Sequence, residues 1–587
     1  MSTFRPLPLV LAIAAVLAMG ACSRNTSNPE LAGQRDNQRP RSAVAEEREA
    51  GQLSQDAAAK QVRPAEPSAL SAPAPVITQE LKQEGLAGSV VSAPQALATG
   101  PADRLGLNET TDTERYADMA ANPVIAVRAE PISTFSVDVD TGAYSNARRF
   151  LNQGRMPPTD AVRIEEFINY FDYQYATPVS QTQPFSVSTE LARAPWNADR
   201  WLLKVGLKGY ELALDKLPAS NLVFLLDVSG SMQAPEKLPL VKTAMRLVVE
   251  QMRPQDTIAI VVYAGAAGLV LPATKASDKT TILAALDALE AGGSTNGGQG
   301  IQLAYQVARA HRVEGGVNRV ILATDGDFNV GMVDQQDLED LIVRERQTGI
   351  ALTTLGFGQD NYNDQTAERL ADLGNGNHAY IDNEREARKV LVRELSANLL
   401  TIAKDVKIQI EFNPTVVAEY RLIGYENRLL ATEDFNNDAV DAGDIGAGHT
   451  VTALYELTPV GSPALRLPPL RYQANEALDK AGKEVAFLKL RYKLPQEDRS
   501  RLIEAAVERP SAIGAGSQQL QFAAAVAAFG EALRGGKYLD GFRYQAIATL
   551  AQRNIGADPY GMNGELLQLI DRAKSLSGEA TDIAIAQ

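Results

Sequence analysis

The sequence predicts an α/β protein with a doubly wound, mostly parallel sheet and helices on both faces, set in or beside a β-rich domain. The run 222–226 is apolar without interruption, which is typical of a strand buried on both faces at the centre of a parallel sheet. From that run to about residue 403, strand-like and helix-like segments alternate. Segments with the two-residue period of half-buried strands lie on either side of this stretch.

The central segment is expected to follow a regular order of strands and helices. The expected strands cover residues 222–227, 257–263, 318–325, 350–357 and 378–381. The expected helices cover residues 236–252, 279–290, 298–313, 334–348, 362–373 and 384–403. Ligands of open α/β sheets bind beyond the carboxyl ends of the strands, so the residues that follow these strands are the first candidates for a site.

Small oxygen-bearing side chains follow two of these strands and one glycine-rich loop. Their alternate positions after the central strand allow several of them to point at one spot. Carboxylate and hydroxyl oxygens, with water, are the ligands of a hard cation. The sequence therefore predicts a divalent metal site. The candidate ligands are Asp227, Ser229, Ser231, Thr295 and Asp325.

These residues resemble the metal-ion-dependent adhesion site of the von Willebrand factor type A (VWA) domain. Its pattern is D-x-S-x-S, then a separate Thr, then a separate Asp at a strand end, and the resemblance covers residues 217–404. It implies that the three hydroxyls touch Mg²⁺ (or Mn²⁺ or Ca²⁺) directly, while the two carboxylates act directly or through water. It also implies an open coordination position that accepts an Asp or Glu of a protein partner. Two alternatives stay open: a polar loop that only caps helices, or a VWA fold whose site holds metal weakly or not at all.

The N-terminus resembles a bacterial lipoprotein signal. Residues 7–21 are almost wholly apolar and end at Cys22, the single cysteine of the chain. The stretch is too short to span a bilayer but suits a signal peptide. We expect a signal peptide over 1–21 and a lipidated, palmitate-bearing Cys22. By the bacterial sorting rule that this pattern resembles, an Asp after the cysteine retains a lipoprotein in the inner membrane. Ser23 follows here, so we expect an outer-membrane anchor facing the periplasm. The alternative is an ordinary secretory signal with an incidental cysteine.

The predicted domain boundaries follow changes in composition. Residues 22–121 are rich in Ala, Pro, Ser and Gln and are expected to form a disordered tether. The β segments before and after the central domain are expected to pair, so that the VWA domain interrupts a β domain. The remaining predicted regions are an N-terminal αβ segment (122–183), flanking strands (184–216), the VWA domain (217–404), a β-rich domain (405–500) and a helical C-terminal region (501–587). This order of regions resembles a family of bacterial VWA lipoproteins with a β-rich C-terminal region. Residues 435–456, which contain Gly-Ala-Gly-His, resemble part of that C-terminal region.

Two other features of the sequence are given structural roles. Asp140-Thr141-Gly142 mimics the aspartic-protease tripeptide, but that chemistry needs a second carboxylate from another lobe or subunit. We expect Asp140 or Thr141 to cap the helix that follows. The three histidines of the chain are far apart and have no ligand spacing, so they are expected to be structural.

Composition excludes several classes of partner. The formal net charge of -15 argues against nucleic acid, and the glycine-rich loops lack the lysine of a nucleotide-binding loop. We expect a non-enzymatic, membrane-anchored envelope protein that binds a protein partner, of unknown identity, through the metal site. The alternatives are a metal-dependent hydrolase that uses Asp325 or Asp327, and a structural envelope protein with a vestigial metal site. Replacing Asp227 with Ala would distinguish the three.

Overall fold

The computed structural model of the chain describes residues 114–178, 182–326, 335–359, 362–468 and 483–579. All of them belong to one compact unit. The predicted signal peptide and most of the predicted tether lie outside the described residues. No helix in the described ranges is long and apolar enough to cross a membrane.

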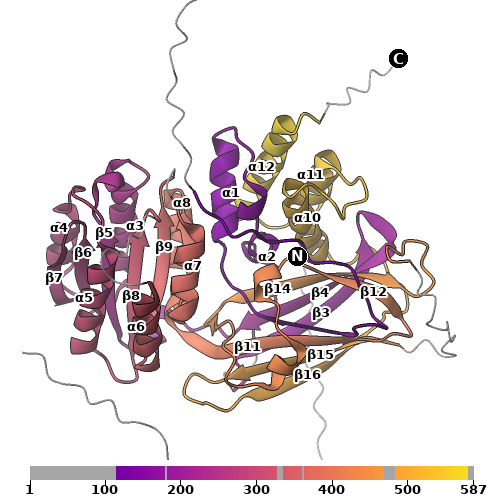
Figure 1. Cartoon of the computed structure of the whole chain (residues 1–587), viewed down its shortest axis with the longest axis horizontal. Helices are drawn as coiled ribbons and strands as arrows, with labels where there is room; N and C mark the ends of the chain where they lie inside the picture. The colour runs from indigo at the N-terminus through magenta and orange to yellow at the C-terminus, as the bar shows by residue number, and fades with distance from the viewer. Residues whose placement is uncertain (1–113, 179–181, 327–334, 360–361, 469–482, 580–587) are drawn as a thin grey trace, which may run out of the picture. The chain divides into compact units, whose positions relative to one another are not determined.

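The central sheet has the order β10-β9-β8-β5-β6-β7 and is parallel except for the β6–β7 pair. Figure 1 shows it at the left, between two layers of helices. Its strands are β5 (Ser220–Asp227), β6 (Thr257–Tyr263), β7 (Ala267–Lys275), β8 (Val317–Thr324), β9 (Ala351–Phe357) and β10 (His378–Ile381). The helices around it are α3 (Leu238–Gln251), α4 (Lys279–Asp287), α5 (Gly297–Ala310), α6 (Gln335–Gln347) and α7 (Asp364–Leu373).

Strand β5 shows why helices cover both faces of this sheet. All of its residues are buried. Leu222, Phe224 and Leu226 join a core with α3 and α4, whereas Val223 and Leu225 join a separate core with α5, α6 and α7. Successive side chains of a strand point to opposite faces, so an uninterrupted apolar run needs a helix layer on each side. The predicted fold class is confirmed.

Two details of this domain differ from the prediction. Strand β7 was not expected, because its exposed Leu269 and Val270 and its Pro272 give it no regular pattern. The expected helix 384–403 is broken into α8 (Glu384–Arg388), a π-helical turn (Lys389–Arg393) and α9 (Leu395–Leu399). The chain then enters a strand at Thr401, inside the segment predicted to be helical.

The β-rich part consists of two sheets packed on a shared core. One has the order β1-β12-β14-β4-β3 and the other the order β13-β11-β15-β16, with β2 paired to β11. Strand β4 precedes the VWA domain in the chain and pairs with β14, which follows it. This pairing confirms that the VWA domain interrupts a β domain. The strands are β1 (Ile125–Ala126), β2 (Ile132–Ser136), β3 (Phe185–Ala194), β4 (Asn197–Gly209), β11 (Thr401–Phe412), β12 (Val417–Ile423), β13 (Ile445–Gly446), β14 (Thr450–Pro459), β15 (Glu484–Lys493) and β16 (Arg501–Glu508).

Helices from both ends of the described chain cover the outer face of the first sheet. They share a core with Ala192, Leu202, Ile423 and Leu454 of that sheet. Figure 1 shows α10 to α12 beside α1. The helices are α1 (Gly142–Asn152), α2 (Ile164–Asn169), α10 (Gln518–Leu533), α11 (Tyr544–Arg553) and α12 (Met562–Leu576). The region predicted to be helical from residue 501 therefore begins with a strand, β16, and becomes helical only at α10.

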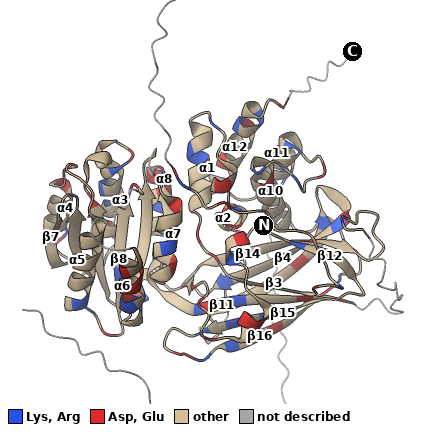
Figure 2. Cartoon of the chain, in the orientation of Figure 1, with Lys and Arg blue, Asp and Glu red and all other residues tan. Residues whose placement is uncertain are grey.

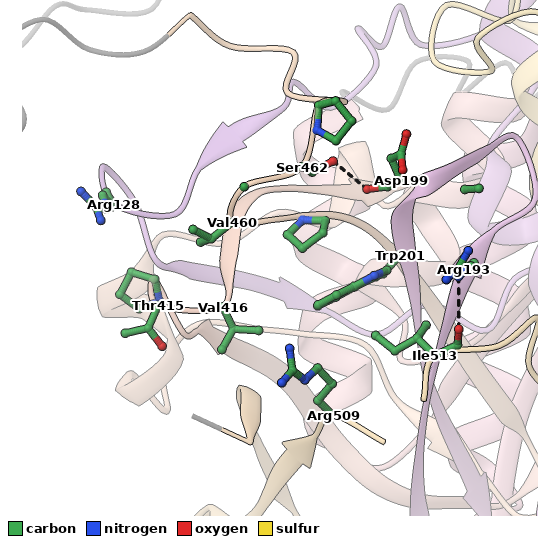
Figure 3. Close-up of a pocket in the computed structure, with 15 residues that line it drawn as sticks. Arg128, Arg193, Asp199, Trp201, Thr415, Val416, Val460, Ser462, Arg509 and Ile513 are labelled. Carbon is green, nitrogen blue, oxygen red and sulfur yellow. Dashed lines mark hydrogen bonds between the residues drawn. The ribbon is translucent and has the colours of Figure 1, made fainter. Parts of the chain in front are cut away.

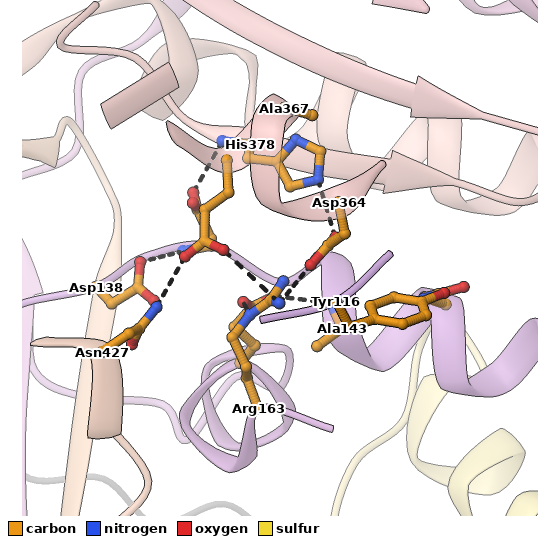
Figure 4. A network of polar contacts seen from close by, with 12 residues as sticks. Tyr116, Asp138, Ala143, Arg163, Asp364, Ala367, His378 and Asn427 are labelled. Carbon is orange, nitrogen blue, oxygen red and sulfur yellow. Dashed lines mark hydrogen bonds and ion pairs between the residues drawn. The ribbon is translucent and has the colours of Figure 1, made fainter. Parts of the chain in front are cut away.

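The expectation for Asp140 and Thr141 was wrong in its detail. Thr141 stands before α1 but makes no capping hydrogen bond with its side chain. Instead, Glu166 Oε2 accepts the amide of Ala143 at 2.7 Å. Asp140 Oδ1 accepts the backbone N–H of His378 at 3.0 Å, so this carboxylate joins the N-terminal segment to β10 of the VWA domain. Figure 4 shows the surrounding polar network.

The predicted tether ends too late. Residues 114–121 are described and make specific contacts: Glu114 forms an ion pair with Arg149 at 2.7 Å, and Arg115 bridges to Asn363. Tyr116 accepts a hydrogen bond from Asn146. These polar contacts have no local periodicity, which explains why composition alone assigned them to the tether.

Candidate metal centre

The loop after β5 is shaped by the carboxylate of Asp227. This side chain is fully buried at the end of the central strand, opposite Tyr263 of β6. Its Oδ1 accepts the backbone N–H of Ser229 at 2.8 Å, which turns the chain back over the strand end. The hydroxyls of Ser229 and Ser231 are then 3.0 Å apart. Three of the predicted ligands are thus close together, with Ser231 exposed and the other two buried.

Backbone hydrogen bonds tie this loop to the glycine-rich loop that carries Thr295. Gly230 donates to the carbonyl of Gly293 at 3.0 Å, and Gly292 donates to the carbonyl of Val228 at 2.8 Å. Gly293 has φ +87°, which a side chain would strain. Thr295 follows two residues later and is half-buried just before α5. Within the described part of the chain, its hydroxyl makes no hydrogen bond to the other candidate ligands.

Asp325 comes from the neighbouring strand. β8 pairs in parallel with β5, and Asp325 directly follows it, fully buried. The negative charge of Asp325 is close enough to Asp227 to raise the pKa of that carboxyl group. The parallel pairing therefore brings together two carboxylates that are far apart in the sequence, as the motif predicted.

A lysine that the sequence analysis missed also belongs to this centre. Lys237 Nζ donates to Asp325 Oδ2 at 2.9 Å, and only 9% of the lysine side chain is exposed. It stands immediately before α3. The residues around Lys237 in the sequence do not indicate that this lysine is buried or that it pairs with Asp325. The ammonium group places one positive charge beside the two carboxylates, and it compensates part of the cost of burying Asp325.

The electrostatics of Asp227 favour a cation nearby. Burial raises the pKa of Asp227 to about 6, an effect opposed by hydrogen bonds from Ser229 and Tyr263 and strengthened by the charge of Asp325. Its second oxygen, Oδ2, is buried and has no hydrogen bond of ordinary geometry within the described residues. The Tyr263 hydroxyl on β6 is close enough to this carboxylate to lower its pKa, but burial outweighs it, and a buried carboxylate is unfavourable unless a proton or a cation compensates its charge. Together with two hydroxyl oxygens nearby, it fits a hard divalent cation such as Mg²⁺.

The remaining residues considered in the sequence as ligands or catalytic groups add nothing to this centre within the described part of the chain. No group of three or more His, Cys, Asp or Glu side chains within the described ranges could hold a metal ion. A centre made of two carboxylates and three hydroxyls is not of that type. Cys22, Asp327 and the rest of the loop 327–334 lie outside the described residues. His378 bonds to Thr354 and Tyr362 in the interior.

Comparison with known proteins agrees with the architecture. The family model of the von Willebrand factor type A domain matches residues 221–394, and one described as von Willebrand factor matches residues 110–204. The model of the C-terminal part of uncharacterized protein YfbK matches residues 397–576. The chain is 47% identical over 509 residues to uncharacterized protein YfbK of Escherichia coli (strain K12), which is 85% of this chain and 88% of that protein. The chain belongs to the YfbK family.

More distant similarities are confined to part of the chain. The human inter-alpha-trypsin inhibitor heavy chain H3 is 24% identical over 260 residues, 40% of this chain and 28% of that protein. A solved structure, von Willebrand factor type A from Catenulispora acidiphila, is 16% identical over 65% of this chain and 89% of that chain, with a TM-score of 0.37. The VWA domain of this chain rests on the family model that matches residues 221–394, and VWA domains suggest protein–protein interaction and often bind a divalent metal.

Proposed function

We propose that this member of the YfbK family is a non-enzymatic envelope protein that binds a protein partner through a divalent metal. Asp227, Ser229, Ser231, Thr295 and Asp325 would hold the ion, and a partner Asp or Glu would complete its coordination. The observation that carries the proposal is the state of Asp227 at the end of β5. One of its oxygens orders the serine loop, whose two hydroxyls lie 3.0 Å apart, and burial still raises the pKa of the carboxyl group to about 6 despite hydrogen bonds from Ser229 and Tyr263.

The hydroxyls of the centre would bind the ion, whereas Asp227 and Lys237 would hold the loop and the Asp325 carboxylate in position. The three hydroxyls are neutral, so they can bind Mg²⁺, Mn²⁺ or Ca²⁺ without cancelling its charge, which leaves the ion attractive to a carboxylate. The Asp227 carboxylate orders the loop through the Ser229 amide. Lys237 keeps the Asp325 carboxylate oriented and neutralises part of its charge. When bound, the metal would supply an electrophilic position for the partner's carboxylate.

The location of the protein is part of the proposal. A lipid on Cys22 would anchor the chain in the outer membrane, with the folded part facing a partner in the periplasm. The net charge of -15 favours a contact with a partner carboxylate that is mediated by a metal ion over a direct contact, since like charges repel across an interface. Figure 2 shows acidic and basic residues interspersed along the helices and strands. The hydrolase alternative has no specific observation in its favour among the described residues.

Metal-dependent capture tests this function. The full-length chain with Cys22→Ser, immobilised, is exposed to periplasmic and membrane extracts with Mg²⁺ or with EDTA. The proposal predicts a partner that binds with Mg²⁺, elutes with EDTA and is not retained by Asp227→Ala. A matched control is Asp337→Ala, which removes an exposed carboxylate of α6 and should retain the partner. Capture that is indifferent to EDTA and to Asp227→Ala would contradict the proposal.

A further inference from the structure

A cavity of about 690 Å³ lies at one end of the β-rich part, and none of the predicted metal ligands lines it. Segments far apart in the sequence form it: the hairpin β3–β4, the turns next to β1, β11 and β14, and the residues after β16. Figure 3 shows Trp201 in its wall with Arg193 and Arg509 nearby. Its volume falls in the usual range of ligand sites, about 300–1,000 Å³.

The charge of this cavity is opposite to that of the protein. Arg128, Arg193 and Arg509 line it, and Asp199 is the one carboxylate among its lining residues. The whole chain has 72 acidic and 57 basic residues. A local excess of guanidinium groups in an acidic protein attracts anions selectively to that place.

Two of these arginines keep donors available for a ligand. Arg193 uses Nε to bind the carbonyl of Ile513 at 3.2 Å, and this orients its terminal nitrogens. Arg509 uses its backbone N–H to bind Lys483, and its guanidinium has no ion pair or hydrogen bond within the described ranges. By contrast, the buried Arg148 and Arg163 each bind two or more carboxylates. Guanidinium groups with available donors can bind a carboxylate through paired hydrogen bonds.

Apolar surface accompanies the arginines. The half-buried indole of Trp201 forms part of the wall, with Val416 beside it and Val460 52% exposed. Prolines 414, 459 and 463 line the same cavity. Tryptophan and arginine are the residues that most often dominate binding at protein interfaces. A ligand that combines a carboxylate with apolar groups would therefore match both features of this cavity.

The cavity is held in shape before any ligand binds. Ser462 Oγ donates to the carbonyl of Asp199 at 2.8 Å, and Val460 N–H donates to the carbonyl of Val416 at 2.9 Å. Arg193 N–H donates to the carbonyl of Gly514, also at 2.9 Å. These bonds fix the segments that form the rim. A site that needs little ordering loses less entropy on binding.

We propose that this cavity binds a short peptide segment of a partner protein that carries a carboxylate flanked by apolar side chains. The Arg193 and Arg509 guanidiniums would attract the carboxylate, and the apolar groups would contact Trp201 and Val460. A single negative charge suits the site better than a polyanion, because Asp199 would repel further charges. The carboxylate can be a chain terminus or an Asp or Glu side chain. The site is independent of the metal centre.

The test uses three labelled pools of random hexapeptides built from Leu, Val, Pro, Ala and Gly, and follows fluorescence polarisation with the full-length Cys22→Ser chain. One pool ends in a free carboxylate, the second has a central Glu and an amidated terminus, and the third is amidated without Glu. Binding of the first pool identifies a terminal carboxylate as the ligand group, and binding of the second identifies a side-chain carboxylate. The third pool should bind at least about tenfold more weakly.

Variants separate this site from the metal centre. Arg193→Ala with Arg509→Ala, and separately Trp201→Ala, should each weaken peptide binding about tenfold or more. The matched control Arg501→Ala removes an exposed arginine of β16 that pairs with Glu497, and it should leave binding unchanged. Asp227→Ala and EDTA should also have no effect, so failure here is distinguishable from failure of the metal proposal.

Two results would overturn the inference. The first is that neither carboxylate pool binds; if vesicles of anionic phospholipid then bind and the double arginine variant abolishes their binding, the cavity is assigned to a membrane surface. The second is that the neutral pool binds as well as the carboxylate pools.

Discussion

The predicted metal centre and the polar junction between the VWA domain and the N-terminal segment both bury carboxylates, but they neutralise them differently. In the junction, Arg163 binds Glu166 and Asp364, and Arg428 binds Glu368 and Asp372. The metal centre has one lysine for two carboxylates and surrounds them with neutral hydroxyls. In the junction, the arginine donors neutralise the carboxylates through fixed ion pairs. In the metal centre, neutral hydroxyls surround carboxylates that are only partly neutralised, and an exchangeable cation can bind there.

Protons complete the neutralisation of the junction. Burial, with help from neighbouring carboxylates, raises the pKa of Glu165 to about 8 and that of Glu166 to about 7. Glu165 also accepts the N–H of Tyr425 at 2.9 Å. Glu165, which forms no ion pair among the described residues, therefore keeps its proton near neutral pH. The comparison indicates that buried carboxylates form a cation-binding site only where neither an arginine nor a proton neutralises their charge.

Removing the arginine of the junction should have the largest effect. Arg163→Leu leaves Glu166 and Asp364 buried without their common partner, and it should lower the free energy of unfolding by about 3–5 kcal/mol. Urea denaturation measures this. Arg388→Leu, which removes an exposed pair with Glu384, should cost less than about 1 kcal/mol. Equal losses in the two variants would contradict the structural role of the junction.

Lys237→Met probes the metal centre in the same way. Asp325 loses its buried ammonium partner, so stability in EDTA should fall by about 3 kcal/mol. Unlike in the junction, saturating Mg²⁺ should restore most of the loss, because a bound ion stabilises the folded state. The measurement is urea denaturation of parent and variant with and without Mg²⁺. An Mg²⁺ effect no larger than in the parent would refute this account of Lys237.

The protonated carboxylates predict how stability depends on pH. Since the pKa of Glu165 is raised from 4.5 to about 8, the folded state binds a proton that the unfolded state has released in that interval. Stability should therefore fall as the pH rises from about 5 to about 8, by roughly 2–3 kcal/mol. Glu165→Gln keeps an oxygen for Tyr425 and should flatten this dependence. A stability that rises over the same interval would show that the junction carboxylates are ionised.

The smallest effect on stability is expected from Ser231→Ala. The residue is exposed and its hydroxyl contacts only the Ser229 hydroxyl among the candidate ligands, so its removal should change the free energy of unfolding by less than about 1 kcal/mol. Metal affinity should nevertheless fall by about tenfold or more, since one direct ligand is lost. Thermal denaturation and Mn²⁺ titration of the same preparation separate the two quantities. A variant with unchanged affinity would remove Ser231 from the ligand set.

The parts of the fold that the sequence predicted are those with a strong local pattern. The apolar run of β5 predicted a central parallel strand, and the spacing of Asp227, Ser229 and Ser231 predicted their cluster. β7 and β16 were missed because exposed residues such as Leu269 and Leu502 blur the pattern of a half-buried edge strand. Lys237 was missed because its partner lies 88 residues away, and nothing near it in the sequence indicates a buried ion pair.

Calorimetric titration of the full-length Cys22→Ser chain with Mg²⁺ tests the central claim most directly. The account predicts saturable binding of one ion in the parent and in Asp337→Ala, and no binding in Asp227→Ala with its fold intact by circular dichroism. Saturable binding that survives in Asp227→Ala, or no binding in the parent, would contradict it and leave a VWA domain whose partner binds without a metal.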